Sequence, residues 1–256
     1  MPDAEPLDIL FTAPHPDDLE IGMGGTIAKL VDLGYRVGML HMTNGEPTPR
    51  GTLEIRATES AAAAKVLGTA FCQTLDLPNR ELMDGPEARY KVATVLRRHR
   101  PKILVGMAGR TPGASPDHYQ AQLITEGARF YAQLTKWDDR FDGTTPYRVD
   151  HLVYRPVPFG AEVTHWHCRF VMDISDTIER KLDAVRCYAS QFDDVRSERV
   201  THYVRSVAAT EGAMAGVMYG EQFALPRPAS VTDMVAMLGE WKIPPPFDPK
   251  SPPASD

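Results

Sequence analysis

The sequence predicts an α/β fold in which helices cover both faces of a mostly parallel sheet, followed by a smaller and less regular C-terminal part. Two observations support this prediction. Short apolar runs typical of buried strands alternate with segments whose apolar residues recur at helical spacing. The chain has 256 residues, 43% of them hydrophobic, which is enough to bury a core without disulfide support.

The expected strands and helices follow one another in a regular order in the first half of the chain. Strands are expected at residues 7–13, 36–43, 70–76 and 102–107, and helices at 26–33, 54–67, 86–100 and 116–134. Gly34 and Gly68 follow two of these helices, at a position where glycine readily adopts a left-handed conformation. In the second half, strands are expected at 151–156 and 169–174, helices at 175–190 and 196–219, and an amphipathic segment at 231–241.

Residues 1–242 are expected to form a single domain, and residues 243–256 a proline-rich tail. The chain has 22 prolines among 256 residues, well above the usual level of about 5%. Six of them lie in the tail, where apolar residues show no periodic pattern. We therefore expect the tail to be extended.

The charge balance and the cysteines exclude several functional classes. The 34 acidic residues outnumber the 28 basic ones, so a broad nucleic-acid-binding face is not expected. No apolar run approaches the ~20 residues of a membrane span, and the N-terminus lacks the pattern of a signal peptide. Cys72, Cys168 and Cys187 form no Cys-x-x-Cys pair, which argues against a cysteine-based zinc site. We expect a cytoplasmic protein without nucleic-acid or membrane partners.

The motif Pro14-His15-Pro16-Asp17-Asp18 follows the first expected strand directly. Ligands bind at the carboxyl ends of strands in open α/β sheets. A histidine with two carboxylates suits a divalent metal, because imidazole nitrogen and carboxylate oxygen are both good zinc ligands. One carboxylate can bind the metal while the other takes a proton from a water whose pKa the metal lowers to about 7. The alternative is that both aspartates are turn or helix-capping residues.

A second motif, Ser115-Pro116-Asp117-His118, follows the fourth expected strand at the start of a helix. A catalytic zinc site uses three protein ligands and leaves one position open. His15, Asp18 and His118 would supply these ligands from two strand ends. The alternative for His118 is a solvent-facing ring in a first helical turn, and the recurrence of the pattern at a second strand end weakens that alternative.

The segment Gly22-Met-Gly-Gly25 has two interpretations. It could form a nucleotide-binding loop, but it lacks the full Gly-x-Gly-x-x-Gly spacing. We favour the other interpretation, in which the glycines allow a neighbouring helix to approach closely beside the first motif.

With these motifs, the chain resembles the LmbE-like, or PIG-L, superfamily of zinc-dependent N-deacetylases. The resemblance covers most of the chain and is carried by Ala13-Pro-His-Pro-Asp-Asp18, Ile21-Gly-Met-Gly-Gly25, Thr43-Asn-Gly-Glu46, Arg56, Glu59, Leu67-Gly68, Pro116 to His118, Asp173-Ile-Ser175, Lys181, Tyr188-Ala-Ser-Gln-Phe192 and Tyr219-Gly-Glu-Gln-Phe223. The late segments resemble the bacterial, bacillithiol-type branch. The resemblance implies a Rossmann-like three-layer sandwich, which agrees with the predicted order of strands and helices.

The resemblance also implies a role for each matching residue. Asp17 would be the general base, and Asp117, a second catalytic residue, would orient a neighbouring group. Arg56 and Glu46 would bind the polar part of the substrate. The implied cofactor is Zn2+, or another divalent metal, held by His15, Asp18 and His118.

Ser115 departs from the family pattern, because many members have histidine at this position. That histidine is thought to stabilise an oxyanion or to act as a general acid, and the loss of one oxyanion donor typically costs about 2.7–4 kcal/mol. Three interpretations remain open. His165 or His167 supplies the missing group, the metal alone polarises the carbonyl, or the chain is a slow enzyme or a binding protein. We favour the first, although His165 and His167 could simply share one face of an extended segment.

The residues and the resemblance together predict a zinc-dependent hydrolase that removes an acetyl group from the amide nitrogen of a small N-acetyl amino sugar or its conjugate. One alternative is an amidase that acts on a thiol conjugate or another non-sugar amide. The other is a metal- or sugar-binding protein whose catalysis is weakened by Ser115. The resemblance further implies a homo-oligomer, with a hexamer as the specific expectation.

Overall fold

The computed structural model describes residues 4–110, 113–158 and 168–239. The strands are β1 (Ile9–Ala13), β2 (Val37–Thr43), β3 (Phe71–Leu77), β4 (Ile103–Ala108), β5 (His151–Pro156), β6 (Arg169–Asp173) and β7 (Gly220–Ala224). The helices are α1 (Asp18–Asp32), α2 (Leu53–Leu67), α3 (Pro86–His99), α4 (Asp117–Tyr131), the 3-10 helix η1 (Asp138–Phe141), α5 (Ile178–Arg186), α6 (Asp194–Ala215) and α7 (Met234–Gly239).

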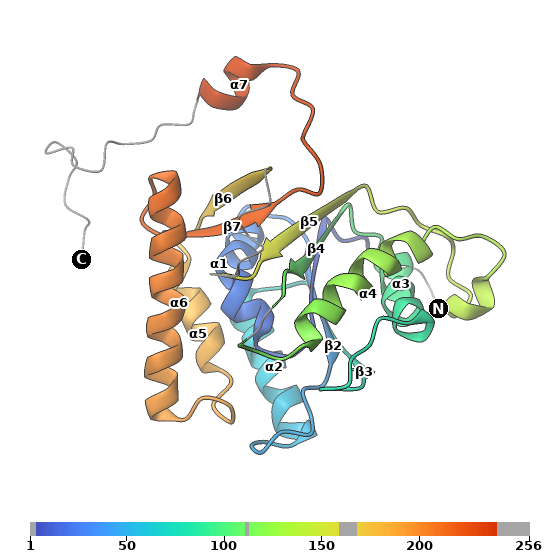
Figure 1. Ribbon diagram of the computed structural model, residues 1–256, viewed down its shortest axis with the longest axis horizontal. Helices are drawn as coiled ribbons and strands as arrows, with labels where there is room; N and C mark the ends of the chain where they lie inside the picture. The colour runs from blue at the N-terminus through green and yellow to red at the C-terminus, as the bar shows by residue number, and fades with distance from the viewer. Residues whose placement is uncertain (1–3, 111–112, 159–167, 240–256) are drawn as a thin grey trace, which may run out of the picture.

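The strands form a 7-stranded sheet in the order β3-β2-β1-β4-β5-β7-β6 (Figure 1). The five strands from β3 to β5 in this order run parallel to one another, whereas β7 is antiparallel to both β5 and β6. The predicted α/β fold with a mostly parallel sheet is therefore confirmed. The antiparallel pair β6 and β7, together with α6, makes the C-terminal part more regular than the sequence suggested.

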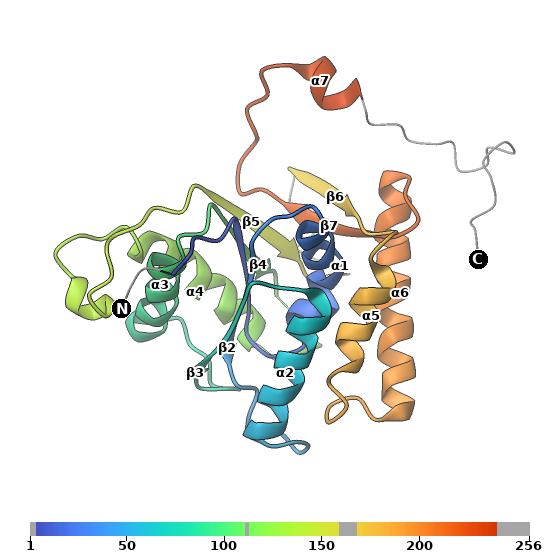
Figure 2. The same ribbon diagram turned by 180° about the vertical axis from the view of Figure 1, so that it is seen from behind.

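Alternating residues of the strands build two separate cores, one on each face of the sheet. Ile9 and Phe11 of β1 pack with residues of α1, α2 and α5, whereas Leu10 packs with residues of α3 and α4. This alternation follows from the two-residue period of a strand. The helices accordingly form one layer on each side of the sheet, as the two opposite views show (Figures 1 and 2). The three-layer arrangement is thus confirmed.

Helix α1 begins at Asp18, eight residues before the helix that the sequence predicted at 26–33. The prediction was wrong because glycines usually disfavour helix interiors. Here they are needed for packing: a Cβ on Gly25 would lie 2.6 Å from Ile174 Cδ1, and one on Gly24 would lie 3.1 Å from Lys181 Cγ. The glycines therefore let α5 and the residues just before it approach α1 closely. This agrees with the interpretation that we favoured for Gly22-Met-Gly-Gly25.

Strand β7 was not predicted, because its sequence Gly-Glu-Gln-Phe-Ala carries two polar residues on a strand that is buried throughout. The structure explains how the acidic residue is accommodated. The carboxylate of Glu221 forms an ion pair with Lys181 and accepts hydrogen bonds from the main-chain N–H groups of Gly25, at 3.0 Å, and Thr26, at 2.8 Å. A buried charge is tolerated when it is paired and hydrogen-bonded in this way.

The other elements lie close to their expected positions. From β2 to β4, each begins and ends within one residue of the prediction, whereas α5 and α6 end four residues earlier than expected. The amphipathic segment at 231–241 contains α7. The proline-rich tail at 243–256 lies outside the described residues, so the division into one domain and a tail stays a prediction. In the part of the chain that the structure describes, no helix has the length and apolar character needed to cross a membrane.

The close packing at Gly25 yields a stability prediction. We expect Gly25→Ala to lower the free energy of unfolding by about 1–3 kcal/mol, because the added methyl group overlaps the buried side chain of Ile174. Urea unfolding followed by circular dichroism measures the change. The matched control is Gly113→Ala, whose Cβ would meet no atom within 4 Å. Equal stability of the two variants would contradict the packing argument.

Candidate metal and catalytic site

The two His-Asp motifs meet at the carboxyl edge of the sheet. Strand β1 has β2 on one side and β4 on the other, so the strand order reverses at this point. Ligands bind in the crevice at such a reversal in open α/β sheets. The loop after β1 carries His15, and α4, which begins at Asp117 after β4, carries His118. The expected meeting of the two motifs is therefore observed.

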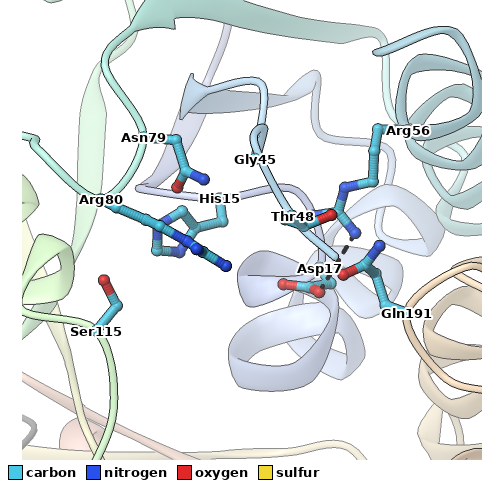
Figure 3. A pocket seen from close by; sticks show the side chains of 9 residues that line it. All are labelled: His15, Asp17, Gly45, Thr48, Arg56, Asn79, Arg80, Ser115 and Gln191. Carbon is cyan, nitrogen blue, oxygen red and sulfur yellow. Dashed lines mark ion pairs between the residues drawn. The ribbon is translucent and has the colours of Figure 1, made fainter. Parts of the chain in front are cut away.

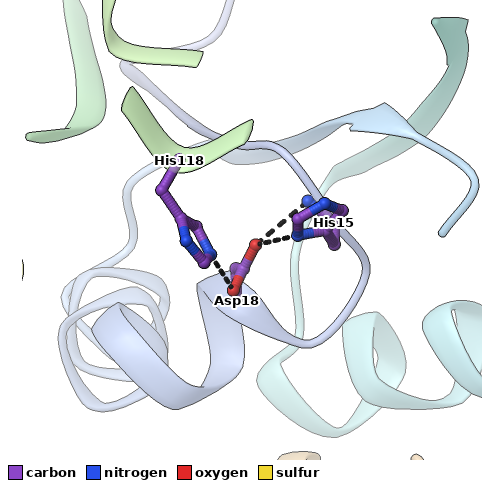
Figure 4. Close-up of side chains that lie close together, drawn as sticks. All are labelled: His15, Asp18 and His118. Carbon is purple, nitrogen blue, oxygen red and sulfur yellow. Dashed lines mark hydrogen bonds and ion pairs between the residues drawn. The ribbon is translucent and has the colours of Figure 1, made fainter. Parts of the chain in front are cut away.

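His15, Asp18 and His118 lie close together and could hold a metal ion. His15 Nδ1 lies 3.0 Å from Asp18 Oδ2, and His118 Nε2 lies 3.1 Å from Asp18 Oδ1 (Figure 4). One ligand atom of each residue lies within 4.8 Å of the other two. Their side chains are 12–15% exposed, so a small solute can reach them. Two imidazoles and one carboxylate are typical ligands of a catalytic zinc ion, and these residues therefore fit a divalent metal.

The charges within this cluster shift its proton equilibria strongly. Burial alone would lower the pKa of His15, but Asp18, Asp117 and Asp17 outweigh it and raise this pKa to about 9. The pKa of Asp18 lies well below its usual range, because His118 and His15 outweigh the opposing effect of burial. Asp18 likewise raises the pKa of His118 against the effect of burial. The carboxylate is thus ionised and stabilises positive charge, and a metal that binds here displaces the imidazole protons.

Asp117 orients the first of these histidines. Its side chain is 1% exposed, and its Oδ2 lies 3.0 Å from His15 Nε2. His15 directs Nδ1 toward Asp18, so Nδ1 is the nitrogen that could bind a metal there. Asp117 contacts the other ring nitrogen, Nε2. A carboxylate on the second nitrogen of a ligating histidine fixes the orientation of the ring. The same Oδ2 also accepts a hydrogen bond of 2.7 Å from the main-chain N–H of Arg80.

Asp17 lies beside the cluster and lines the adjoining cavity. Its φ of 103° is in the left-handed region, which is uncommon for residues other than glycine. Its Oδ2 lies 3.7 Å from Arg56 Nη1. Burial and the neighbouring charge of Asp18 raise the pKa of Asp17 to about 7, and Arg56 opposes this increase. A carboxyl group with such a pKa is well suited to accept a proton near neutral pH.

Arg56 reaches the site from α2 and is held on several sides. Its Nη2 donates a 2.7 Å hydrogen bond to the main-chain oxygen of Pro16, and its guanidinium carbon lies 5.5 Å from the centre of the Tyr188 ring. A Cβ on Gly45, whose φ is 77°, would lie 2.8 Å from Nη2, so only glycine fits there. Nε and Nη1 of Arg56 have no hydrogen-bond partner among the described residues. Both atoms are buried, and Nη1 takes part in the ion pair with Asp17.

The cavity beside the cluster has a volume of about 210 Å³ (Figure 3). It is lined by His15, Asp17, Gly45, Thr48, Arg56, Asn79, Arg80, Ser115 and Gln191. Gln191 belongs to the segment Tyr188-Ala-Ser-Gln-Phe192 that carries part of the family resemblance. The sequence did not indicate every residue of the lining. It missed Thr48, Asn79 and Arg80. The last two follow Leu77 at the carboxyl end of β3, so the rule that located the motifs after β1 and β4 could also have located them.

Glu46, the second expected substrate-binding residue, is not among the residues that line the cavity. Its carboxylate instead accepts a 2.7 Å hydrogen bond from the main-chain N–H of Thr48 and a 3.0 Å hydrogen bond from the hydroxyl of Thr48. Glu46 thus supports the loop that forms one wall. Ser115 does line the cavity, whereas His165 and His167 lie outside the described residues.

His41 is a further residue at the site that the sequence did not indicate. This residue of β2 is fully buried, and its Nδ1 lies 3.2 Å from the main-chain oxygen of His15. Burial lowers the pKa of His41 to about 4, so the ring is neutral at physiological pH. Nδ1 therefore donates its hydrogen to this oxygen and supports the loop that carries His15.

Comparison with known proteins agrees with this geometry. Residues 10–128 match the PIG-L family, described as GlcNAc-PI de-N-acetylase. The chain is 34% identical over 223 residues to diacetylchitobiose deacetylase of Thermococcus kodakarensis. The aligned region covers 83% of this chain and 80% of that protein. The chain belongs to the PIG-L family. The resemblance that the motifs indicated is therefore confirmed.

Two further proteins are similar to this member of the PIG-L family. The solved structure of N,N'-diacetylchitobiose deacetylase from Pyrococcus horikoshii has a TM-score of 0.74 and 30% identity, over 85% of this chain and 82% of that one. A 4-oxalmesaconate hydratase of Pseudomonas putida is 25% identical over 220 residues, or 80% of each chain. The chain is thus similar both to enzymes named as deacetylases and to an enzyme named as a hydratase.

The hydrogen bond between Asp117 and His15 yields a prediction about metal affinity. We expect Asp117→Asn to weaken the binding of Zn2+ or Co2+ by about 10–100-fold. The neutral amide replaces the carboxylate that contacts His15 Nε2, so the ring is held less firmly in the orientation that a metal needs. Competition with a chelator of known affinity measures the change. The matched control is Asp139→Asn on the exposed surface, which should leave the affinity unchanged. Wild-type affinity in Asp117→Asn would refute the role of Asp117.

Proposed function

We propose that this protein is a zinc-dependent hydrolase that removes an acetyl group from the amide nitrogen of a small N-acetyl amino sugar or its conjugate. One observation carries the proposal. Two histidines and a carboxylate that fit a metal lie beside a second carboxyl group, Asp17, whose pKa is raised to about 7. Ligands for a Lewis acid and a base for water are the groups that amide hydrolysis requires.

Each residue of the site has a separate task in this reaction. His15, Asp18 and His118 would hold Zn2+, which when bound would supply a Lewis acid for the acetyl carbonyl and would lower the pKa of the attacking water. Asp17 takes the proton of that water and later passes it to the leaving amine. Arg56 forms an ion pair with Asp17 and lines the cavity, where its positive charge binds a polar substituent of the substrate. Asp117 keeps the His15 ring in its ligating orientation.

The choice of an N-acetyl amino sugar rests on the relatives and on the cavity. Diacetylchitobiose deacetylase is 34% identical to this chain, whereas the hydratase is 25% identical, so deacetylation is favoured over hydration. A volume of about 210 Å³ suits a small polar group, and the lining is rich in hydrogen-bonding side chains. A thiol conjugate or a non-sugar amide is the alternative substrate, and a metal-binding protein with weak catalysis is the alternative function.

An assay of metal content and substrate range tests the proposal directly. We expect the purified protein to bind about one Zn2+ per chain and to release acetate from N-acetylglucosamine, diacetylchitobiose or an N-acetylglucosamine conjugate. Chelation should abolish the activity, and added metal should restore it. Cleavage of non-sugar amides alone would favour the amidase alternative, and metal binding without turnover would favour the binding protein. The expected homo-oligomer stays a prediction that light scattering can test.

Asp17→Asn gives the sharpest prediction about the mechanism. The amide has nearly the shape of the carboxyl group but cannot accept the proton of water, so we expect kcat to fall by about 100- to 10,000-fold. The release of free amine measures the rate. The bound zinc should stay at the wild-type level, because Asp17 is not one of the ligands. The exposed Asp150→Asn is the matched control, and wild-type turnover of zinc-loaded Asp17→Asn would rule out Asp17 as the base.

A further inference from the structure

The proposed reaction creates a negative charge on the acetyl oxygen, to which no side chain of this chain has yet been assigned. When water adds to the acetyl carbon, an electron pair of the C=O bond moves onto the acetyl oxygen. Hydrogen-bond donors that face this oxyanion supply a large part of the stabilisation in such reactions. Two guanidinium groups, Arg56 and Arg80, line the cavity, and they differ in the contacts that they already make.

Arg56 is held by its surroundings on the side of Asp17. Its side chain is 4% exposed, and its Nη2 is bonded to Pro16. Its Nη1 lies 3.7 Å from Asp17, and Tyr188 lies against the guanidinium plane. Arg56 therefore compensates the charge of Asp17 and binds the substrate from that side.

Arg80 has a fixed main chain and an uncommitted side chain. Its main-chain N–H is bound by Asp117, which also holds His15, so the position of Arg80 is tied to a metal-binding histidine. Among the residues that the structure describes, the guanidinium of Arg80 forms no hydrogen bond or ion pair. Its side chain comes from the connection between β3 and α3 and lines the same cavity as His15 (Figure 3).

The backbone of Arg80 supports a functional role. Its φ of 67° is in the left-handed region, where glycine is favoured and arginine is uncommon. Residues in such conformations occur preferentially at active sites. Asp17, with a φ of 103°, lines the same cavity. Ser115 also lines the cavity, but its hydroxyl carries no charge. Among the described residues that line the cavity, Arg80 is thus the arginine whose guanidinium forms no hydrogen bond or ion pair.

We propose that Arg80 is a catalytic residue that donates hydrogen bonds to the oxyanion formed during deacetylation, an inference that rests on the proposed function. Water forms a bond to the acetyl carbon, its proton goes to Asp17, and the displaced pair on the acetyl oxygen faces Arg80. When the C–N bond breaks, that pair restores the C=O bond and the amine takes the proton from Asp17. Acetic acid and the free amine leave, the acid gives its remaining proton to solvent to become acetate, and Arg80 keeps its proton throughout.

Arg80→Gly tests this role, because glycine accepts the left-handed backbone and removes only the side chain. We expect kcat to fall by about 100- to 1,000-fold while KM and bound zinc stay near the wild-type values. Arg80→Lys, which keeps the charge, should lose less activity. A tetrahedral phosphonamidate analogue of the acetamide gives a readout without turnover. Its dissociation constant should rise by a similar factor in Arg80→Gly, whereas that of glucosamine should not change.

The control and the contrary outcomes separate this inference from the proposed function. Arg148→Gly removes the same charge from an exposed position outside the cavity and should leave kcat and analogue binding unchanged. If wild type is active but Arg80→Gly has wild-type kcat, or changes only KM, Arg80 is not catalytic and the proposed function still holds. If the zinc-loaded wild type releases no acetate from any N-acetyl sugar, the proposed function and this inference both fail.

Discussion

A single buried carboxylate, Asp117, joins the ends of three parallel strands. Its Oδ2 lies 3.0 Å from His15, which follows β1, and accepts the main-chain N–H of Arg80, which follows β3, while Asp117 itself comes after β4. The sheet brings these ends to one edge, but it does not fix the loops that extend from them. Because its side chain is 1% exposed, a lost bond would leave Asp117 poorly compensated, at a cost of about 1–3 kcal/mol or more. The geometry of the whole site depends on this contact.

The adjacent residues Asp17 and Asp18 show how the environment assigns different tasks to the same side chain. Asp18 lies between His15 and His118, whose positive charges keep it ionised and suited to bind a cation. Asp17 faces a single cation, Arg56, at 3.7 Å and feels the charge of Asp18, so its pKa is raised instead. Two neighbouring carboxyl groups whose pKa values are pushed apart are a common arrangement for a ligand or stabiliser beside a proton acceptor.

The sequence allowed the metal cluster to be located, because His15, Asp18 and His118 follow strands whose ends must meet in a parallel sheet. It did not reveal Arg80, since an arginine after a strand lacks the distinctive chemistry of a His-Asp pair and its role depends on a main-chain bond to Asp117. The start of α1 and the strand β7 were missed for a related reason. Both depend on tertiary contacts that override local preference: the close packing at the helix glycines, and the ion pair that neutralises Glu221.

The C-terminal part of the chain shapes the cavity as directly as the first motif does. Tyr188, just after α5, lies against Arg56 and donates a 2.8 Å hydrogen bond to Glu20 of α1. Burial raises the pKa of Glu20 to about 8, so this carboxyl group is largely uncharged near neutral pH. Its hydrogen bond with Tyr188 therefore joins α1 to the segment after α5 without adding a further negative charge near Asp17. Gln191 lines the cavity and donates a hydrogen bond to the main-chain oxygen of Arg50, two residues after Thr48, which also lines the cavity. Substitutions in this late segment would therefore alter the part of the cavity beside Arg56 while leaving His15, Asp18 and His118 in place.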